Sequence, residues 1–483
     1  MFNWFLDVSK YIFNTNFKIQ SNFPYNSSGD LINLINDPTT PLLVDKTPLD
    51  EALSRASVTN LKFNVIGFCG GNYQLNTPPG KAANCYMTTL KTLEMVKQHQ
   101  FRPISRWAIT PSIKIYPIAG KDLNAYYDRR AVKLFYHGNY YTANSAEILS
   151  HELGHGILDA FRPDTWSVQA IELWSFHEAF ADLTSMLTVL QSDQMINLVL
   201  KETNNTLRTD NSMSKIAEEI GKAIYEISST GGRNPNYLRN AINDYKYVDP
   251  TNLSEEGTYE TISAECHSFG RIFLGAFYDI LVMMYDHNRK KNGLKPTDAL
   301  KIARNILTKY TLKAICHVPI SPKFYEAFAR TMLWVDWSDK KEYHNQMWDI
   351  FVNRNIIQPV KALNSINHND VKGEILEKNE NGFIIKSGRI ETITIANHLP
   401  RNVLSSQKIN PLLSCEVDVA SENIYIFDKN GNSINYVETS TSEKIFSAMY
   451  CLDRLQATKS VSNDEKTPFE IVDNKLTRTN YDF

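Results

Sequence analysis

The pentapeptide HELGH, at residues 151–155, constrains this chain of 483 residues more than any other feature of its sequence. It lies inside the segment NSAEILSHELGHGILDAF, whose apolar residues recur at helical intervals, so we expect an α-helix over 145–161. Side chains four positions apart lie one above the other on one face of a helix. His151 and His155 can therefore bind one metal ion together, with Glu152 beside them to accept a proton from a water molecule on that ion.

A second apolar-periodic segment, SFHEAFADLTSML, follows the pentapeptide and predicts a helix over 175–190. It carries Glu178 and, one turn later, Asp182. Catalytic zinc ions take three protein ligands and keep one position open. We therefore expect Glu178 to be the third metal ligand. We expect Asp182 to accept the second ring N–H of a liganding histidine and so fix its tautomer.

Both acidic residues also have ordinary interpretations, which remain open at this point. Ser175 and Glu178 have the spacing of a capping box, as do Asn144 and Glu147 at the start of the first helix. In that interpretation Glu178 only satisfies the backbone at a helix end. Asp182, in turn, has the position of a solvated charge on a helix surface.

Two further side chains lie close to these residues in the sequence, and neither is expected to react. His177 precedes Glu178, but neighbouring helical positions point about 100° apart, so both cannot easily reach one ion. We expect His177 to face outward or to support a ligand. Cys266 is more typical of a buried thiol than of a nucleophile.

Charge and composition argue against several classes of protein. The chain has 51 basic and 53 acidic residues and a pI near 6.6, which disfavours a nucleic-acid partner. No apolar run approaches the roughly 18 residues that span a bilayer, and the amino-terminal MFNWFLDVSKYIF lacks the basic start of a secretory signal. The six cysteines include no CxxC pair, which is typical of free thiols in a reducing compartment. We expect a cytoplasmic protein, or one exported without a conventional signal peptide; the oligomeric state is left open.

The length and the changing residue pattern predict several domains within an α+β fold class. Four parts are expected: an N-terminal extension at 1–50, a β-rich lobe at 51–160 that ends in the HELGH helix, a helical lobe at 161–357, and a β-rich accessory module with a polar tail at 358–483. The linker before that module is expected near 358–370. Further expected elements are strands over 61–68, 112–118 and 131–136 and helices over 82–99, 214–227, 267–286, 297–309 and 322–333.

HExxH followed by a helix with the pattern ExxxD resembles the gluzincin metallopeptidases, and the thermolysin-like neutral proteases in particular. The resemblance covers roughly residues 80–357. It implies a two-lobed fold, with a β-rich N-terminal lobe, a helical C-terminal lobe and the HELGH helix between them. It also implies one catalytic zinc ion as cofactor.

Two more segments resemble this family and imply roles for further residues. Residues 124–128, NAYYD, look like its Asn-Ala-aromatic-aromatic motif. The resemblance implies that the Asn124 side chain and the Ala125 carbonyl hold the substrate backbone as an added edge strand. His267 is placed like the family's histidine that donates a hydrogen bond to the developing oxyanion, with Glu265 as its acidic partner.

Other parts of the family pattern are replaced or absent. The arginine that contacts the substrate carbonyl in the family is assigned to Arg208, with Arg271 as the alternative. No tyrosine lies between the pentapeptide and Glu178, where the family usually carries a second oxyanion donor; Trp166, Arg162 or no residue takes its place. The acidic clusters that build the family's calcium sites are not evident, so calcium is not predicted. The chain therefore resembles a diverged, non-secreted branch.

These features favour a zinc endopeptidase that acts on a peptide or protein substrate. Zinc would polarise the scissile carbonyl and acidify its water, Glu152 would move the proton to the leaving amine, and His267 would stabilise the oxyanion. A catalytically silent zinc- or peptide-binding protein on the same scaffold is one alternative, against which the presence of Glu152 argues. A zinc hydrolase of a non-peptide amide is the other, opposed only by the motif at Asn124 and Ala125.

Overall fold

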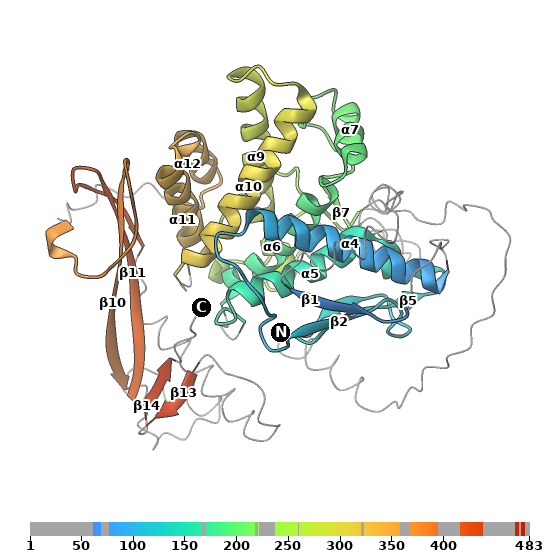
Figure 1. Ribbon diagram of the computed structural model, residues 1–483, viewed down its shortest axis with the longest axis horizontal. Helices are drawn as coiled ribbons and strands as arrows, with labels where there is room; N and C mark the ends of the chain where they lie inside the picture. The colour runs from blue at the N-terminus through green and yellow to red at the C-terminus, as the bar shows by residue number, and fades with distance from the viewer. Residues whose placement is uncertain are drawn as a thin grey trace.

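The computed structural model describes residues 61–68, 77–166, 170–217, 221, 237–258, 260–319, 323–357, 368–394, 416–437, 469–472 and 475–478. These residues form helices and several β-sheets, so the fold class is α+β, as the sequence predicted (Figure 1). The N-terminal extension expected at 1–50 lies outside the described residues, as does most of the linker expected at 358–370.

A four-stranded sheet forms the first part of the described chain. Its strands run in the order β1 (Lys62–Val65), β2 (Ser112–Tyr116), β4 (Ala131–Leu134) and β3 (Ala125–Tyr127). The β1–β2 and β2–β4 pairs are parallel, whereas β3 runs antiparallel to β4 at the edge of the sheet. Ile113 and Ile115 are both fully buried, because side chains two positions apart share one face of a strand. Among the described strands, none pairs with the outer side of β3.

One long helix and several short elements accompany this sheet. α4 (Pro78–His99) connects β1 to β2, and its first turn is capped by Thr77, whose hydroxyl accepts a hydrogen bond from the backbone N–H of Gly80. A small hairpin of β5 (Tyr136–His137) and β6 (Tyr140–Tyr141) follows β4. A turn of 3₁₀-helix, η1 (Thr142–Asn144), then leads into the next helix.

The helix that carries HELGH, α5 (Ala146–Phe161), lies in the middle of the molecule and contacts α4, β3 and β4 as well as the helices that follow it. Its N-cap is Ser145, whose hydroxyl accepts a backbone hydrogen bond from the first turn. The capping box expected from Asn144 and Glu147 is wrong. The Glu147 carboxylate instead accepts a hydrogen bond from the backbone N–H of Ala217, far along the chain.

Helices dominate the part of the described chain that follows α5. They are α6 (Ile171–Val189), α7 (Asp193–Glu202), α9 (Cys266–Lys290), α10 (Pro296–His317), α11 (Phe324–Asp339) and α12 (His344–Asn353). α6 packs against α5, α9 and α11, and α10 packs against α9 and α11. An aromatic cluster joins α6, α9 and α11, and consists of Phe176, Phe273, Phe277, Phe324 and Phe328. Among the described residues, α9 alone is long and apolar enough for a bilayer span, and 83% of that stretch is buried inside the protein.

Some elements of this lobe differ from the sequence-based expectation. The helix expected over 214–227 does not begin there, because β7 (Lys215–Ile216) pairs with β8 (Arg239–Asn240). Most of the remainder of that range lies outside the described residues. The sequence did not indicate α7 or α12, whose lengths of 10 residues each leave little room for a periodic pattern. One further 3₁₀ turn, η2 (Pro250–Asn252), lies between β8 and α9.

The described residues of the C-terminal module form mainly β-strands. Its strands are β9 (Glu374–Asn379), β10 (Gly382–Thr394), β11 (Glu416–Asp428), β12 (Ser433–Val437), β13 (Phe469–Val472) and β14 (Lys475–Arg478). They follow the order β13–β14–β11–β10–β9, with β12 also paired to β11, and η3 (His368–Asp370) precedes them. β13 and β14 lie within the segment that the sequence predicted as a polar tail.

This module shares its core with the helical lobe. Ile384, Ile424 and Ile426 belong to the same buried apolar cluster as the helices. β9 and β12 both contact α11, beside which β10 and β11 stand in Figure 1. Lys313 of α10 forms an ion pair with Glu377 of β9, with 2.7 Å between Nζ and Oε2. The module is therefore packed against the helices and is not separated from them by solvent.

Candidate metal centre

The candidate metal centre lies where helices α5 and α6 approach each other closely. Gly154 of α5 faces Ala181 of α6, and a Cβ atom added at Gly154 would lie 2.7 Å from the Ala181 Cα. Only glycine permits this approach. The two helices carry the expected ligands on their facing sides, His151 and His155 on α5 and Glu178 on α6.

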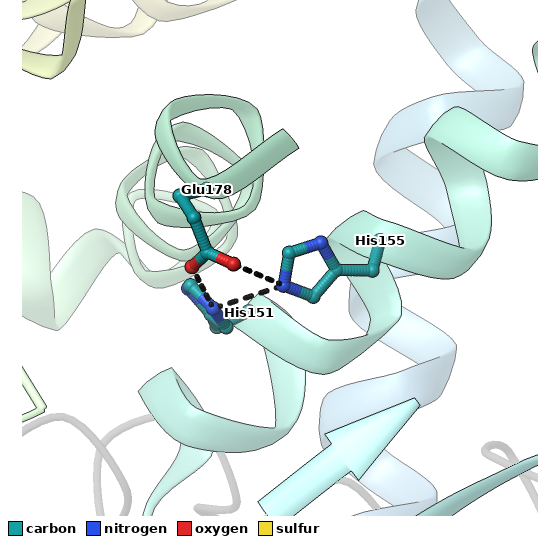
Figure 2. A group of neighbouring side chains, drawn as sticks. All are labelled: His151, His155 and Glu178. Atoms are coloured by element: carbon teal, nitrogen blue, oxygen red, sulfur yellow. Dashed lines mark hydrogen bonds and ion pairs between the residues drawn. The ribbon is translucent and has the colours of Figure 1, made fainter. Parts of the chain in front are cut away.

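The three expected ligands converge on one point (Figure 2). The Nε2 atoms of His151 and His155 are 3.2 Å apart. The distances from His151 Nε2 to Glu178 Oε2 and from His155 Nε2 to Glu178 Oε1 are 3.4 and 3.7 Å. Donor atoms that share one tetrahedral zinc ion at 2.0–2.1 Å lie about 3.3–3.4 Å from one another. The spacing therefore suits a single metal ion between them.

The chemistry of the donor atoms fits a cation. Oε2 of Glu178 is buried without a hydrogen-bond partner in the described part of the chain, although it faces an imidazole nitrogen. Burial would lower the pKa of His151, but Asp182 and Glu178 raise it to about 9. Burial, more than anything else, lowers the pKa of His155 to about 3, so this ring presents a neutral lone pair. The group thus favours positive charge at its centre.

Asp182 holds one of the ligands from behind. Its Oδ1 lies 2.8 Å from Nδ1 of His151, opposite the nitrogen that faces Glu178. Arg239 donates two hydrogen bonds to the same carboxylate, at 2.7 and 2.6 Å. Burial alone would raise the pKa of Asp182, but Arg239 and His151 outweigh it and hold that pKa below its usual value. Asp182 is therefore an anion that fixes the His151 ring, and is not a solvated surface charge.

Arg239 is the residue of this centre that sequence reasoning missed. It lies in the two-residue strand β8, which is too short to show a periodic pattern. Its partner Asp182 belongs to a distant segment, helix α6. Its guanidinium is buried, with 8% of the side chain exposed. A fixed two-pronged donor of this kind suits a carboxylate that must keep one orientation.

Glu152 lies next to His151 on α5 and is buried. Its carboxylate accepts a backbone hydrogen bond from Tyr127 of the edge strand β3. Burial is the main cause that raises the pKa of Glu152, to about 7, with Glu178 acting in the same direction and His151 against it. Glu152 therefore lies beside the metal-facing His151 and also bonds to the backbone of the edge strand β3.

His267 stands on the other side of Glu178, at the start of α9. Its Nε2 is 3.4 Å from Oε2 of Glu178, and 42% of its side chain is exposed. Its Nδ1 bonds to Glu265, the acidic partner that the sequence suggested. Glu265 is also the N-cap of α9 and accepts a hydrogen bond from the backbone N–H of Ser268. This histidine therefore combines solvent access with a fixed ring orientation.

Asn124 and Ala125 lie at the beginning of the edge strand. The backbone of Asn124 pairs inward, since its carbonyl accepts a hydrogen bond from the N–H of Phe135. Backbone groups alternate along an antiparallel pair, so the Ala125 carbonyl points away from β4, to the open edge. The Asn124 carboxamide accepts a hydrogen bond from the N–H of Ala125 at 2.9 Å. In this arrangement that side chain is turned onto its own backbone.

The arginine assignment made from the sequence does not agree with the structure. Arg208 is largely exposed and pairs with Asp286, about five turns along α9 from His267, or roughly 28 Å of helical rise. The alternative, Arg271, is buried and donates hydrogen bonds to the Thr261 carbonyl and to neighbouring groups. Neither guanidinium belongs to the three-donor group.

The other replacement candidates also have structural partners. Arg162 forms a buried ion pair with Asp164 and donates to backbone carbonyls of α10 and the residue after it. Trp166 contacts the His177 ring edge-on, at 6.0 Å between centroids. His177 is buried, lies 3.2 Å from the Thr165 hydroxyl through Nε2, and stacks near the His155 ring at 6.1 Å. His177 is therefore buried rather than directed outward, and it lies outside the three-donor group.

No protein-family model matches this chain, and no curated protein matches it significantly.

Proposed function

We propose that this protein is a zinc-dependent endopeptidase. The observation that carries the proposal is the group of His151, His155 and Glu178, spaced for one cation, with Glu152 next to it. Two imidazoles and one carboxylate are the ligand set of a common class of catalytic zinc site. Zinc bound there supplies a Lewis acid that polarises the scissile carbonyl and lowers the pKa of a water molecule.

Two side chains around the group are assigned the proton transfer and the charge stabilisation of peptide hydrolysis. Glu152 accepts the proton of the attacking water and returns it to the leaving amine. His267, with its Nδ1 held by Glu265, donates its other N–H to the oxyanion that forms at the scissile carbonyl. Its exposed side chain is reachable by a substrate that enters from solvent.

The substrate backbone is held by strand addition to β3. The open Ala125 carbonyl accepts a hydrogen bond from a substrate N–H, and the added strand extends the sheet by one. Tyr127 of the same strand already bonds to Glu152, so a peptide placed on this edge lies beside the general base. For the Asn124 carboxamide to take part, it must leave the N–H of Ala125. This edge favours a peptide over a non-peptide amide.

We also infer a two-lobed, thermolysin-like architecture with α5 between the lobes. The support for it is that α5 contacts both the four-stranded sheet and the helical lobe, and carries two of the three donor residues. The β-rich C-terminal module contributes no residue to the three-donor group.

The proposal is tested with wild-type protein and Glu152→Gln, compared for zinc content and for cleavage of an unstructured protein. We expect one zinc ion per chain in both, and a loss of hydrolysis on the order of 10²–10⁴ in the variant, because the general base is removed. Glu147→Gln is a matched control, since it makes the same change on the same helix at a carboxylate that bonds to the Ala217 backbone. Equal turnover by wild type and Glu152→Gln, with zinc bound, would reject the peptidase proposal and favour a binding protein.

His267→Ala tests the second catalytic group separately. It should keep zinc, because His267 is not one of the three donors, and should lower kcat and kcat/KM together by about 10²–10³. Wild-type kinetics in this variant would leave the zinc proposal intact but remove His267 from the mechanism.

A further inference from the structure

A second group of potential metal donors adjoins the first and shares Glu178 with it. Glu178, Cys266 and His267 offer a carboxylate oxygen, a thiol sulfur and an imidazole nitrogen that all lie within 4.8 Å of one another. Cys266 and His267 are the first two residues of α9. Nothing in the catalytic scheme above uses the thiol of Cys266, and that scheme gives His267 no metal.

The orientation of Glu178 and His267 favours binding, and the Cys266 thiol lies beside the same ring, with Sγ 3.5 Å from Nδ1 of His267. Glu265 accepts the Nδ1–H of His267, which turns Nε2 toward Oε2 of Glu178 at 3.4 Å. A carboxylate behind the imidazole is the usual support of a metal-bound histidine. Cys266 Sγ lies 3.4 Å from Oε1 of that same Glu265. The amino end of a helix disfavours a cation, and the Glu265 carboxylate at the N-cap offsets that effect.

Glu178 has the capacity to serve two ions. Its Oε1 faces His155, and its Oε2 lies 3.4 Å from Nε2 of both His151 and His267. Oε2 also has no hydrogen-bond partner among the described residues and is buried. This anionic oxygen therefore faces two imidazoles, one from each group of donors, and is placed to contact an ion on either side.

We propose that Glu178, Cys266 and His267 form a second site, selective for soft divalent cations such as Zn²⁺ or Cd²⁺, with Glu178 bridging the two ions. Thiolate and imidazole ligands select such cations over Mg²⁺ or Ca²⁺. The Cys266 thiol loses its proton to solvent when the ion binds. The bound ion occupies Nε2 of His267, so hydrolysis is inhibited; this consequence, unlike the binding itself, rests on the proposed function.

The experiment adds Cd²⁺ to the full chain already loaded with one zinc ion. Wild-type protein should take up a second ion by elemental analysis, with an ultraviolet thiolate-to-cadmium absorption band, and lose peptidase activity over the same concentration range. Cys266→Ser should lack that band and require at least about tenfold more Cd²⁺, because loss of even a supporting group costs 10–100-fold in affinity. Inhibition is expressed relative to the uninhibited rate of each variant.

Controls separate this site from other thiols and from misfolding. Cys316→Ser changes another partly exposed cysteine, on α10, and should respond to Cd²⁺ as wild type does. Cys69, Cys415 and Cys451 lie outside the described residues, and their contribution is common to wild type and every variant. Cys266→Ala, with zinc content and circular dichroism as checks of folding, provides a second removal of the thiol.

The site is rejected if wild-type protein binds a single ion at saturation, if the second ion produces no thiolate band, or if Cys266→Ser and Cys266→Ala match wild type. The two proposals fail in different ways. A second ion with a thiolate band but no hydrolysis under any condition rejects the peptidase and keeps the site. Hydrolysis that is indifferent to Cd²⁺, with one ion bound, rejects the site and keeps the peptidase.

Discussion

At Asp182, one buried carboxylate meets His151 and Arg239 at the same time. Asp182→Asn removes the negative charge that orients the metal-facing ring and leaves a buried guanidinium without its anion. We expect zinc affinity to fall about 10–100-fold, measured by competition with a chromogenic chelator, and thermal stability to fall with it. The loss of thermal stability follows from the buried ion pair with Arg239. The sequence did not indicate this ion pair.

Asp193→Asn is the matched control for that change. Asp193 is 72% exposed and pairs with Lys301 on the surface, and exposed pairs contribute roughly 0–1 kcal/mol. Zinc affinity and activity should remain at wild-type levels. If Asp182→Asn also retained full zinc occupancy and full rate, Asp182 would have to be regarded as an ordinary helix charge.

His317 gives a pH dependence that is independent of the metal site. Burial, together with the cationic Lys313, Arg102, Lys386 and Arg162, lowers its pKa to about 3. Because this pKa lies below the unfolded value of ~6.5, the unfolded chain binds the proton first, and stability is lost as pH falls below about 6.5.

The expected loss from this single residue is about 2 kcal/mol between pH 7 and pH 5. His317→Leu removes the titrating group, so the variant should lose about that much less stability than wild type over the same interval. Denaturant unfolding at the two pH values measures it, and acid effects from other residues cancel in the comparison. An identical pH dependence in both proteins would show that His317 is protonated in the fold.

At the scale of elements, the distance between α5 and α6 sets the metal site, and Gly154 sets that distance. Alanine at this position gains up to about 1 kcal/mol of helix propensity. Its Cβ would lie 2.7 Å from Ala181 Cα and 3.1 Å from Thr184, and overpacking of this kind typically costs 1–3 kcal/mol. The cost of the clash exceeds the gain in helix propensity, because the nearest atom belongs to the backbone and not to a flexible side chain.

We therefore expect Gly154→Ala to weaken zinc binding as well as lower Tm, since the helices it separates carry different ligands. Gly120→Ala is the control, because its added Cβ would meet nothing closer than 3.6 Å. Zinc titration and thermal unfolding of the two variants give the comparison. A Gly154→Ala protein with wild-type zinc affinity would mean that α5 and α6 can shift without moving the ligands.

Features that depend on one short segment could be predicted from the sequence, whereas contacts between distant segments could not. The spacing of His151 and His155 is a property of one helix, so the pentapeptide was enough to predict their common face. Ser145, by contrast, replaced Asn144 as the N-cap by a one-residue shift, and such boundaries depend on the tertiary path of the chain. Arg239 and the misassigned Arg208 are contacts between distant segments, which no local period encodes.

At the scale of the whole molecule, the C-terminal module and the helical lobe stabilise each other. Ile384, Ile424 and Ile426 are part of the common core. Asn379 and Asn381 donate side-chain hydrogen bonds to backbone carbonyls near the end of α11. The sequence indicated the module from its β-like runs but could not indicate this contact, because the apolar residues on both sides are those of any buried surface.

A chain that ends at residue 357 tests how far the metal site depends on this contact. We expect it to bind zinc, because all three donors and Asp182 lie before the cut, but to have a lower Tm and to bind a hydrophobic dye through the uncovered face of α11. Trp337 packs against Gly382 in the intact chain, and exposing one large side chain costs about 1.5–3 kcal/mol. Lys313→Met in the full chain is the control, since it removes the ion pair to Glu377 and the contacts of the ammonium group with the Phe101 and Trp334 rings, but keeps a side chain of similar length. That variant should lose only a small part of the stability lost by truncation, because the shared apolar core remains covered. If the truncated chain gave no folded protein at all, the module would have to be counted as part of the core that holds the metal site.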